Sequence, residues 1–197
     1  MKSITREEIA KFDKEEFSGQ IIVVDTIDKA DRAIKYLSTF NDLGFDTETR
    51  PAFKKGNLNN MALIQLATND RCYLSRICKT GFLPSLVRLL SDANIRKIGL
   101  SLKDDFTGMN RRMKFTPQGF IDLQKMVSEH NIADISLQKI YAILFQKKIS
   151  KGQQLSNWEA ETLSDAQQKY AALDAWACLK IYEKLCDTIA RQFVKKH

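Results

Sequence analysis

Apolar and polar positions in the first half of the chain follow strand and helix periods in turn. The β-branched run at residues 21–24 predicts a buried strand, and apolar residues at helical spacing over 29–37 predict a helix directly after it. Further strands are predicted at residues 43–46, 61–67, 72–74 and 97–100, the first three of them as a meander. Further helices are predicted at residues 82–90 and 102–113.

The second half of the chain has almost only helical periodicity, with helices predicted at residues 123–127, 137–144 and 164–190. Ser164 and Gln167 fit a capping box at the start of the last helix. Thr5 and Glu8 fit another, which predicts a short helix near the N-terminus. Strands early and helices late predict an α/β fold, with a mixed central β-sheet flanked by α-helices.

Residues 147–158 lack a clean period and are predicted to form an ordered, basic loop. No internal repeat or interdomain linker is visible, and 197 residues can bury a large core without splitting into two. We therefore expect a single domain over residues 1–197, in which residues 1–19 form a peripheral N-terminal segment.

The composition is that of an ordinary globular protein, with 44% hydrophobic and 28% charged residues. The formal charge of +7 favours a polyanionic partner such as nucleic acid, although a solvated cationic surface explains it equally well. The four cysteines form no CxxC pair, so no zinc site is expected. Neither a signal peptide nor a membrane-spanning run is visible, and we expect a cytoplasmic protein with free thiols.

Two acidic residues lie close together in the strand predicted at 43–46 and just after it. The strand period of two places Asp46 and Glu48 on the same face. Between apolar neighbours such a pair is costly unless a cation neutralises it, because desolvated carboxylates repel each other. A solvent-facing edge strand is the alternative, and for a D-x-E triplet alone it is the commoner case.

A second candidate group lies in the last predicted helix. Tyr170 and Asp174 are four residues apart, which places their side chains on one helix face. Leu173, Ala177 and Ile181 continue an inward stripe near that face, so both side chains are expected to point toward the sheet. A core tyrosine beside a solvated aspartate explains the motif equally well.

The third candidate is one of two adjacent aspartates. Ser101 is expected to cap the following helix, with Asp104 as its reciprocal partner, which is a structural role. Asp105 lies three residues after Leu102 and four before Met109, so it borders the inward face. We therefore select Asp105.

If these four acidic residues meet in one cleft, their convergence requires cations. Oxygen ligands without histidine or thiolate favour Mg²⁺ or Mn²⁺. Two such ions about 3.5–4 Å apart stabilise both the attacking and the leaving oxygen at a phosphate.

The three motifs resemble those of the DEDD superfamily of 3′→5′ exonucleases, in the same order: GFDTET (44–49), KIGLSLKDD (97–105) and YAALDAW (170–176). The tyrosine four residues before the last aspartate is similar to the tyrosine (DEDDy) branch, because the histidine branch would have histidine where Lys169 stands. Within that branch the chain resembles the Werner-type exonuclease domains, also through ALIQLA (62–67) and LSNW (155–158). The likeness covers roughly residues 20–185.

This resemblance implies a ribonuclease H-like fold and metal-dependent hydrolysis of phosphodiester bonds from a 3′ end. It also implies that Asp46, Glu48 and Asp174 bind one divalent cation, and that Asp46 and Asp105 hold a second. Tyr170 would hydrogen-bond the attacking water. A phenol with an ordinary pKa of about 10 is a poor base at neutral pH, so we assign activation of the water to the metal.

The Thr49-Arg50-Pro51 segment departs from the Werner-type pattern, which has an aromatic residue there, and this leaves substrate contacts near the rim open. Targeting and processivity are expected either to come from a partner protein or to be absent. Basic residues that could follow the nucleic-acid backbone are Lys54, Lys55, Arg111, Arg112, Lys147, Lys148 and Lys151. For Trp158, packing on the core is favoured over stacking on a base.

Three functions stay open at this point. DNA is the preferred substrate by resemblance, and a ribonuclease D-like activity on RNA is the alternative because the catalytic acids are shared. A catalytically silent nucleic-acid-binding protein is the third. Dinucleotide binding is excluded because the chain has neither G-x-G-x-x-G nor a phosphate-binding loop motif.

Overall fold

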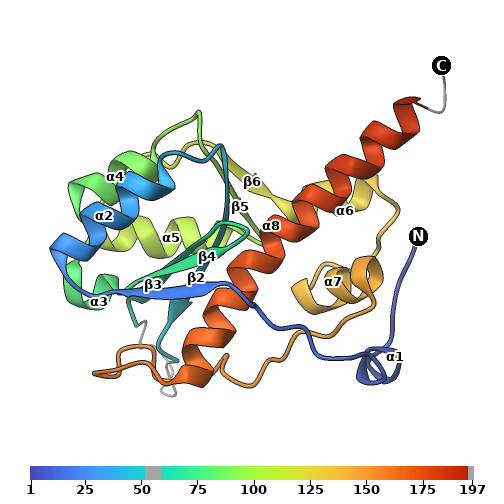
Figure 1. Ribbon diagram of the computed structural model, residues 1–197, viewed down its shortest axis with the longest axis horizontal. Helices are drawn as coiled ribbons and strands as arrows, with labels where there is room; N and C mark the ends of the chain where they lie inside the picture. The colour runs from blue at the N-terminus through green and yellow to red at the C-terminus, as the bar shows by residue number, and fades with distance from the viewer. Residues whose placement is uncertain (52–58, 195–197) are drawn as a thin grey trace.

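A mixed six-stranded sheet forms the centre of the computed structural model, which describes residues 1–51 and 59–194 (Figure 1). The strand order across the sheet is β1-β4-β3-β2-β5-β6. β3 runs antiparallel to both of its neighbours, as predicted for the meander, and the other pairs are parallel. The strands are β1 (Gln20–Val24), β2 (Asp42–Thr49), β3 (Met61–Ala67), β4 (Arg71–Ser75), β5 (Arg96–Gly99) and β6 (Phe120–Asp122).

The helices follow the predicted order, and the four-residue α3 is an addition to it. They are α1 (Arg6–Ala10), α2 (Ile27–Leu37), α3 (Ile77–Thr80), α4 (Pro84–Leu90), α5 (Lys103–Arg112), α6 (Leu123–Glu129), α7 (Leu137–Phe145) and α8 (Asp165–Val194). Both predicted capping boxes are present, at Thr5 with Glu8 and at Ser164 with Gln167. Over residues 1–51 and 59–194, no helix combines the length and apolar content needed to cross a bilayer.

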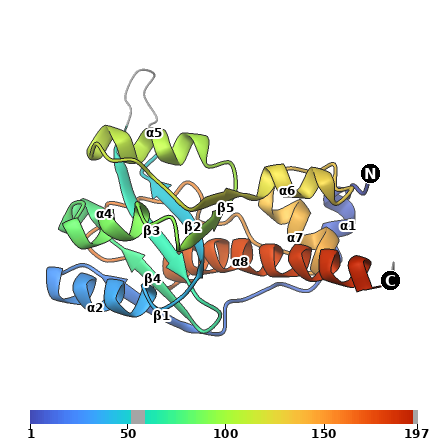
Figure 2. The same cartoon turned by 90° about the horizontal axis from the view of Figure 1, so that it is seen from above.

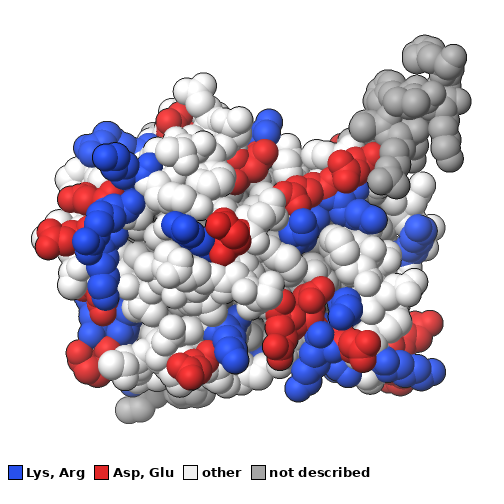
Figure 3. Space-filling view, viewed as in Figure 1, with Lys and Arg blue, Asp and Glu red and all other residues white. Residues whose placement is uncertain are grey.

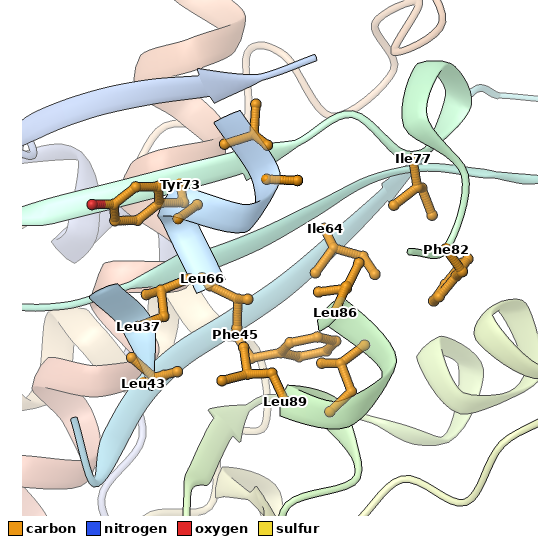
Figure 4. Close-up of a cluster of buried hydrophobic side chains, with 14 of the residues drawn as sticks. Leu37, Leu43, Phe45, Ile64, Leu66, Tyr73, Ile77, Phe82, Leu86 and Leu89 are labelled. Carbon is orange, nitrogen blue, oxygen red and sulfur yellow. The ribbon is translucent and has the colours of Figure 1, made fainter. Parts of the chain in front are cut away.

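The two faces of the sheet are covered differently (Figure 2). One face packs against α2, α4 and α5 through an apolar cluster that includes Leu43, Phe45 and Ile64 (Figure 4). The other face packs against α8, whose small residues Ala171, Ala172 and Ala175 allow close approach. Since side chains alternate along a strand, β2 turns Phe45 toward the first face and Asp46 toward α8.

The contact between β2 and α8 is closest at Gly44. A Cβ atom at this position would overlap the carbonyl oxygen of Ala175. The glycine therefore lets the backbone of α8 approach β2 directly. The contact point lies two residues before Asp46 on the strand and one residue after Asp174 on the helix.

The start of α5 differs from the expectation for Ser101. The helix has no side-chain cap, because Ser101 adopts a left-handed backbone conformation with φ of 61° and Leu102 occupies the N-cap position. The Asp122 carboxylate at the end of β6 instead accepts hydrogen bonds from the backbone N–H groups of Ser101 (3.0 Å) and Leu102 (3.1 Å). The predicted Ser101 cap is wrong because a neighbouring strand supplies the acceptor.

Part of the N-terminal segment expected to be peripheral contacts the helical side of the molecule. The N-terminal strap (residues 13–17) runs beside the basic loop (residues 147–158). The backbones of Lys14 and Lys148 form an isolated parallel β-bridge. The Glu15 N–H donates to the Lys148 carbonyl (2.9 Å), and the Lys148 N–H donates to the Asp13 carbonyl (2.9 Å). Phe17 packs against Trp176 of α8, with ring centroids 5.8 Å apart.

Candidate metal centre

Three carboxylates from two distant parts of the sequence meet between β2 and α8. Asp46, Glu48 and Asp174, the acid cluster, each offer an oxygen, and these atoms lie within 4.8 Å of one another. The strand period of two aims Asp46 and Glu48 at α8, and the packing of the helix at Gly44 brings Asp174 to them. Glu48 is 9% and Asp174 7% exposed, whereas Asp46 is half-buried, so two of the three side chains are withdrawn from water.

Burial raises the pKa of every member of the acid cluster, and repulsion by neighbouring carboxylates raises those of Asp46 and Glu48 further. For Glu48, burial and then the charges of Asp46, Asp174 and Asp105 raise the pKa to about 10. Burial raises the pKa of Asp174 to about 7, although a hydrogen bond with Tyr170 and the charge of Lys151 oppose the change. The pKa of Asp46 is also raised well above its ordinary value, first by burial. A positive charge at the cluster would reverse these shifts.

Asp105 lies beside the acid cluster but outside its set of three oxygens. Its carboxylate accepts a short hydrogen bond from the hydroxyl of Thr47, the residue between Asp46 and Glu48. Burial raises the pKa of Asp105 to about 6, and its charge raises the pKa of Asp46. The neighbouring Asp104 is exposed, so the two aspartates have the inward and outward placements expected from the helix face.

Asp122 and Thr47 are the residues of this region that sequence reasoning missed. Asp122 holds the backbone at the start of α5, and so places Asp105, while Thr47 binds Asp105 directly. Thr47 could have been identified from its position between two candidate acids. Asp122 gave no signal, because the strand that ends at it has only three residues.

Tyr170 lies one helical turn before Asp174 and borders the cluster. Burial, followed by the charge of Asp174, raises the pKa of its hydroxyl above its ordinary value. The phenol therefore stays protonated at neutral pH and can donate a hydrogen bond. Its ring lies 6.1 Å from that of Trp158, which is fully buried, so the packing interpretation of Trp158 is the correct one.

The acid cluster opens into a cavity of about 300 Å³, the acid cavity. Its walls come from β2, α8, the start of α7 and the basic loop. Lys151 and Gln154 are the basic-loop residues that line it, and Ser136 and Gln138 line it from the α7 side. The cavity is large enough to admit a phosphate group and its sugar to the carboxylates.

The other basic residues selected from the sequence are dispersed. Arg111 borders a separate open pocket with Lys114, and Arg112 donates to the carbonyls of Met61 (3.2 Å) and Ile77 (3.0 Å). Arg112 is therefore a structural residue. Basic and acidic side chains are interspersed on the face drawn in Figure 3.

Lys147 and Lys148 are half-buried, and the Lys148 ammonium donates to the carbonyl of Ala10 (2.8 Å). This contact takes one of the three N–H donors of the Lys148 ammonium. Lys54 and Lys55 lie outside the described residues.

The composition of the acid cluster fits a divalent cation. Its donors are all carboxylate oxygens, as hard cations prefer. Within the described part of the chain, no ion pair joins these carboxylates to lysine or arginine. Buried carboxylates without a cationic partner either take up protons or bind a metal.

Comparison with known proteins identifies the family to which this arrangement belongs. Residues 21–190 match the family described as 3′-5′ exonuclease. The chain belongs to this exonuclease family. It is 32% identical over 155 residues to the bifunctional 3′-5′ exonuclease/ATP-dependent helicase WRN of Mus musculus. It is 29% identical over 187 residues to a 3′-5′ exonuclease of Arabidopsis thaliana.

The exonuclease corresponds to only part of these relatives. The matches cover 76% and 87% of the chain but 11% of the mouse protein and 65% of the Arabidopsis protein. Among solved structures, the Nibbler EXO domain of Aedes aegypti superimposes with a TM-score of 0.79 at 23% identity, covering 87% of this chain and 89% of that one. Escherichia coli RNase D gives 0.76 at 22% identity, over 86% of this chain and 44% of its own. The expected ribonuclease H-like fold is confirmed.

Proposed function

We propose that the exonuclease removes nucleotides from the 3′ end of DNA, using two Mg²⁺ or Mn²⁺ ions held around the acid cluster. The observation that carries this proposal is the meeting of Asp46, Glu48 and Asp174 within 4.8 Å, in a buried site with raised pKa values. When bound, divalent ions lower the pKa of a coordinated water and neutralise the charge that develops on the phosphate.

Each acidic residue has its own role in this proposal. The acid cluster would hold one ion, and Asp46 together with Asp105 would hold the second. Thr47 fixes the orientation of Asp105 through the hydroxyl that it donates. Asp122 fixes the start of the helix that carries Asp105.

Tyr170 orients the attacking water in this proposal. A phenol whose pKa is raised by burial stays protonated, so it donates a hydrogen bond and does not accept the proton of the water. Its spacing from Asp174 supports the tyrosine branch of the superfamily. Tyr170→Phe is expected to lower kcat by about 10- to 100-fold and to leave KM nearly unchanged.

DNA is proposed because the sequence resembles Werner-type domains and is 32% identical over 155 residues to the mouse relative. RNA is the second candidate, and the structural similarity to RNase D from Escherichia coli and to a Trypanosoma brucei RNase D bound to RNA favours it. A silent nucleic-acid-binding protein is the third, and the presence of all four acids and Tyr170 counts against it.

The decisive experiment uses a 5′-labelled partial duplex with a recessed 3′ end, and a matched RNA strand. Each is incubated with Mg²⁺, Mn²⁺ or EDTA, beside the Asp46→Ala variant. We expect a metal-dependent ladder of shortened products that Asp46→Ala does not form. Comparing the two strands then gives the sugar preference.

A folded protein that forms no ladder with either metal on either strand would support the silent-binding alternative. Cleavage of RNA alone would replace DNA by RNA in the proposal. A ladder that persists in Asp46→Ala would remove the acid cluster from catalysis.

A further inference from the structure

The basic loop separates the acid cavity from a second cavity of about 310 Å³ behind Tyr170. Lys151 and Gln154 face the acid cavity, whereas Ser150, Gly152 and Gln153 face the second one. The loop is therefore a wall of the candidate active site. Its position decides how far the Lys151 ammonium lies from the carboxylates.

The basic loop is held in place on both of its sides. On the C-terminal side, the Gln167 side chain of α8 donates to the Asn157 carbonyl (3.2 Å), and Trp158 is fully buried. On the N-terminal side, α7 ends at Gln146 in a left-handed conformation, which turns the chain into the loop. The next anchor is Lys148, and its partners come from the N-terminal strap.

The N-terminal strap holds the backbone of Lys148, and α1, which precedes the strap, holds its side chain. Glu15 N–H and the Lys148 N–H form the two backbone hydrogen bonds of the bridge, each 2.9 Å long. The Lys148 ammonium extends the contact to the carbonyl of Ala10. Tyr141 of α7, itself 2% exposed, donates its hydroxyl to the Glu15 carboxylate (2.8 Å) and ties the strap to the helix that precedes the loop.

Lys151 is three residues beyond this anchor and is the only lysine that lines the acid cavity among the described residues. No carboxylate lies within ion-pair distance of its ammonium in residues 1–51 and 59–194. An exposed ammonium at the rim of an anionic cavity is placed to meet the phosphate that the carboxylates and their cations would bind.

We propose that Lys151 contacts a backbone phosphate at the 3′ end of the substrate, and that the N-terminal strap is a positioning element that sets the place of Lys151 through Lys148. This inference rests on the proposed function, because it takes the acid cavity as the place where the 3′ end binds. Glu15 and Tyr141 are then positioning residues, and Lys151 is a substrate-binding residue.

Binding of a short labelled oligonucleotide in EDTA tests the first half, since no cleavage then occurs. Lys151→Gln is expected to weaken binding about tenfold. It should also reduce the slope of log Kd against log salt concentration by about 0.7 to 0.9, the value for one phosphate contact. Lys125→Gln is the control, because it removes one exposed charge from α6, away from both cavities. It is expected to change neither the affinity nor the salt slope.

A double-mutant cycle tests the second half. Glu15→Pro removes the N–H that binds Lys148, and Tyr141→Phe removes the side-chain link to the strap. Each is expected to weaken binding about threefold in the unmodified chain and to have no further effect in the Lys151→Gln background. Thr26→Ala, which opens the N-cap of α2 on the opposite face of the sheet, is the matched control and should leave binding unchanged.

Additive effects of the strap and Lys151 variants would overturn the positioning role, because the strap would then act through something other than Lys151. Unchanged binding and an unchanged salt slope in Lys151→Gln would overturn the whole inference. Cleavage by Asp46→Ala is measured in the same series. The proposed function requires that Asp46→Ala does not cleave, independently of the results for Lys151→Gln, so the two failures can be distinguished.

Discussion

The molecule has two sets of buried charged groups, which differ in whether the chain provides partners for them. Arg76 and Lys97 are 1% and 0% exposed, and each has backbone carbonyls as partners. Arg76 donates to the carbonyls of Ala160 and Glu161, the latter at 2.7 Å, and the Lys97 ammonium donates to those of Leu89 (3.1 Å) and Asp92 (2.7 Å).

The acid cluster has no such compensation. Its carboxylates face one another, and their pKa values are raised. The buried basic groups therefore donate to backbone carbonyls of the chain, whereas the chain provides no cationic partner for the acid cluster among the described residues. Residues of the first kind should matter for stability, and residues of the second kind for function at a cost in stability.

The largest expected effect is on activity at the acid cluster. Asp174→Asn is expected to reduce cleavage by about 10³-fold or more, because it removes one ligand charge from the metal site. In EDTA at pH 8 the same variant should be more stable than the unmodified chain, by about 1–3 kcal/mol, since one buried charge is gone. Denaturant unfolding in EDTA and the ladder assay measure the two effects, and a loss of both activity and stability would contradict the comparison.

The opposite pattern is expected at Arg76. Arg76→Met leaves two buried carbonyl groups without donors and should lower the free energy of unfolding by about 2–4 kcal/mol. Activity per folded molecule should stay near that of the unmodified chain, because Arg76 lines neither cavity. Denaturant unfolding and assays at a temperature where the variant is fully folded test this. A variant that is stable but inactive would place Arg76 in the functional site.

The pH dependence of stability distinguishes the acid cluster next. The pKa of Asp174 is raised to about 7 in the folded chain, from an ordinary value of 3.8. A raised carboxyl pKa contributes stability that is complete below pH 4 and is lost as the pH rises to 7. Unfolding in EDTA should therefore become easier over this range, and Asp174→Asn should flatten the profile.

Mg²⁺ should reverse that trend, because the ion binds the ionised carboxylates and competes with protons. The Mg²⁺ concentration that gives half of the full stabilisation is expected to fall as the pH rises from 6 to 7. The expected fall is about tenfold per pH unit for each proton that the ion displaces. Titrations of Mg²⁺ followed by thermal unfolding measure this midpoint. A midpoint independent of pH would mean that the ion binds elsewhere.

The smallest effect is expected at an exposed ion pair near Arg76. Lys79 pairs with the carboxylate of Glu161 at 2.7 Å, but 90% of that glutamate side chain is exposed. Lys79→Met should change the free energy of unfolding by no more than about 0.5 kcal/mol. It is also the matched control for Arg76→Met, which loses contacts with the backbone of the same glutamate.

Sequence patterns predicted the parts of the fold that repeat locally. The bounds of β3 could be predicted because they are those of an apolar run interrupted only at Gln65, and each capping box is determined by a pair of side chains three residues apart. The inward side of Asp105 followed from helical spacing in the same way.

Contacts between distant segments could not be predicted in this way. The cap at the start of α5 comes from Asp122 of β6, a strand too short to show a period. The pairing of the strap with Lys148 joins residues more than a hundred positions apart, and no local pattern encodes such a contact. The gathering of the acid cluster itself was inferred only from the resemblance and from charge arguments, because its geometry depends on how α8 packs on β2.

That packing gives Gly44 a significance beyond space filling. The direct contact of the Gly44 backbone with Ala175 sets the separation of β2 and α8 beside both Asp46 and Asp174. A side chain at position 44 would push α8 away from β2, and would move Asp174 away from Asp46 and Glu48. The absence of a side chain at one strand position therefore keeps together three carboxylates that come from two distant parts of the sequence.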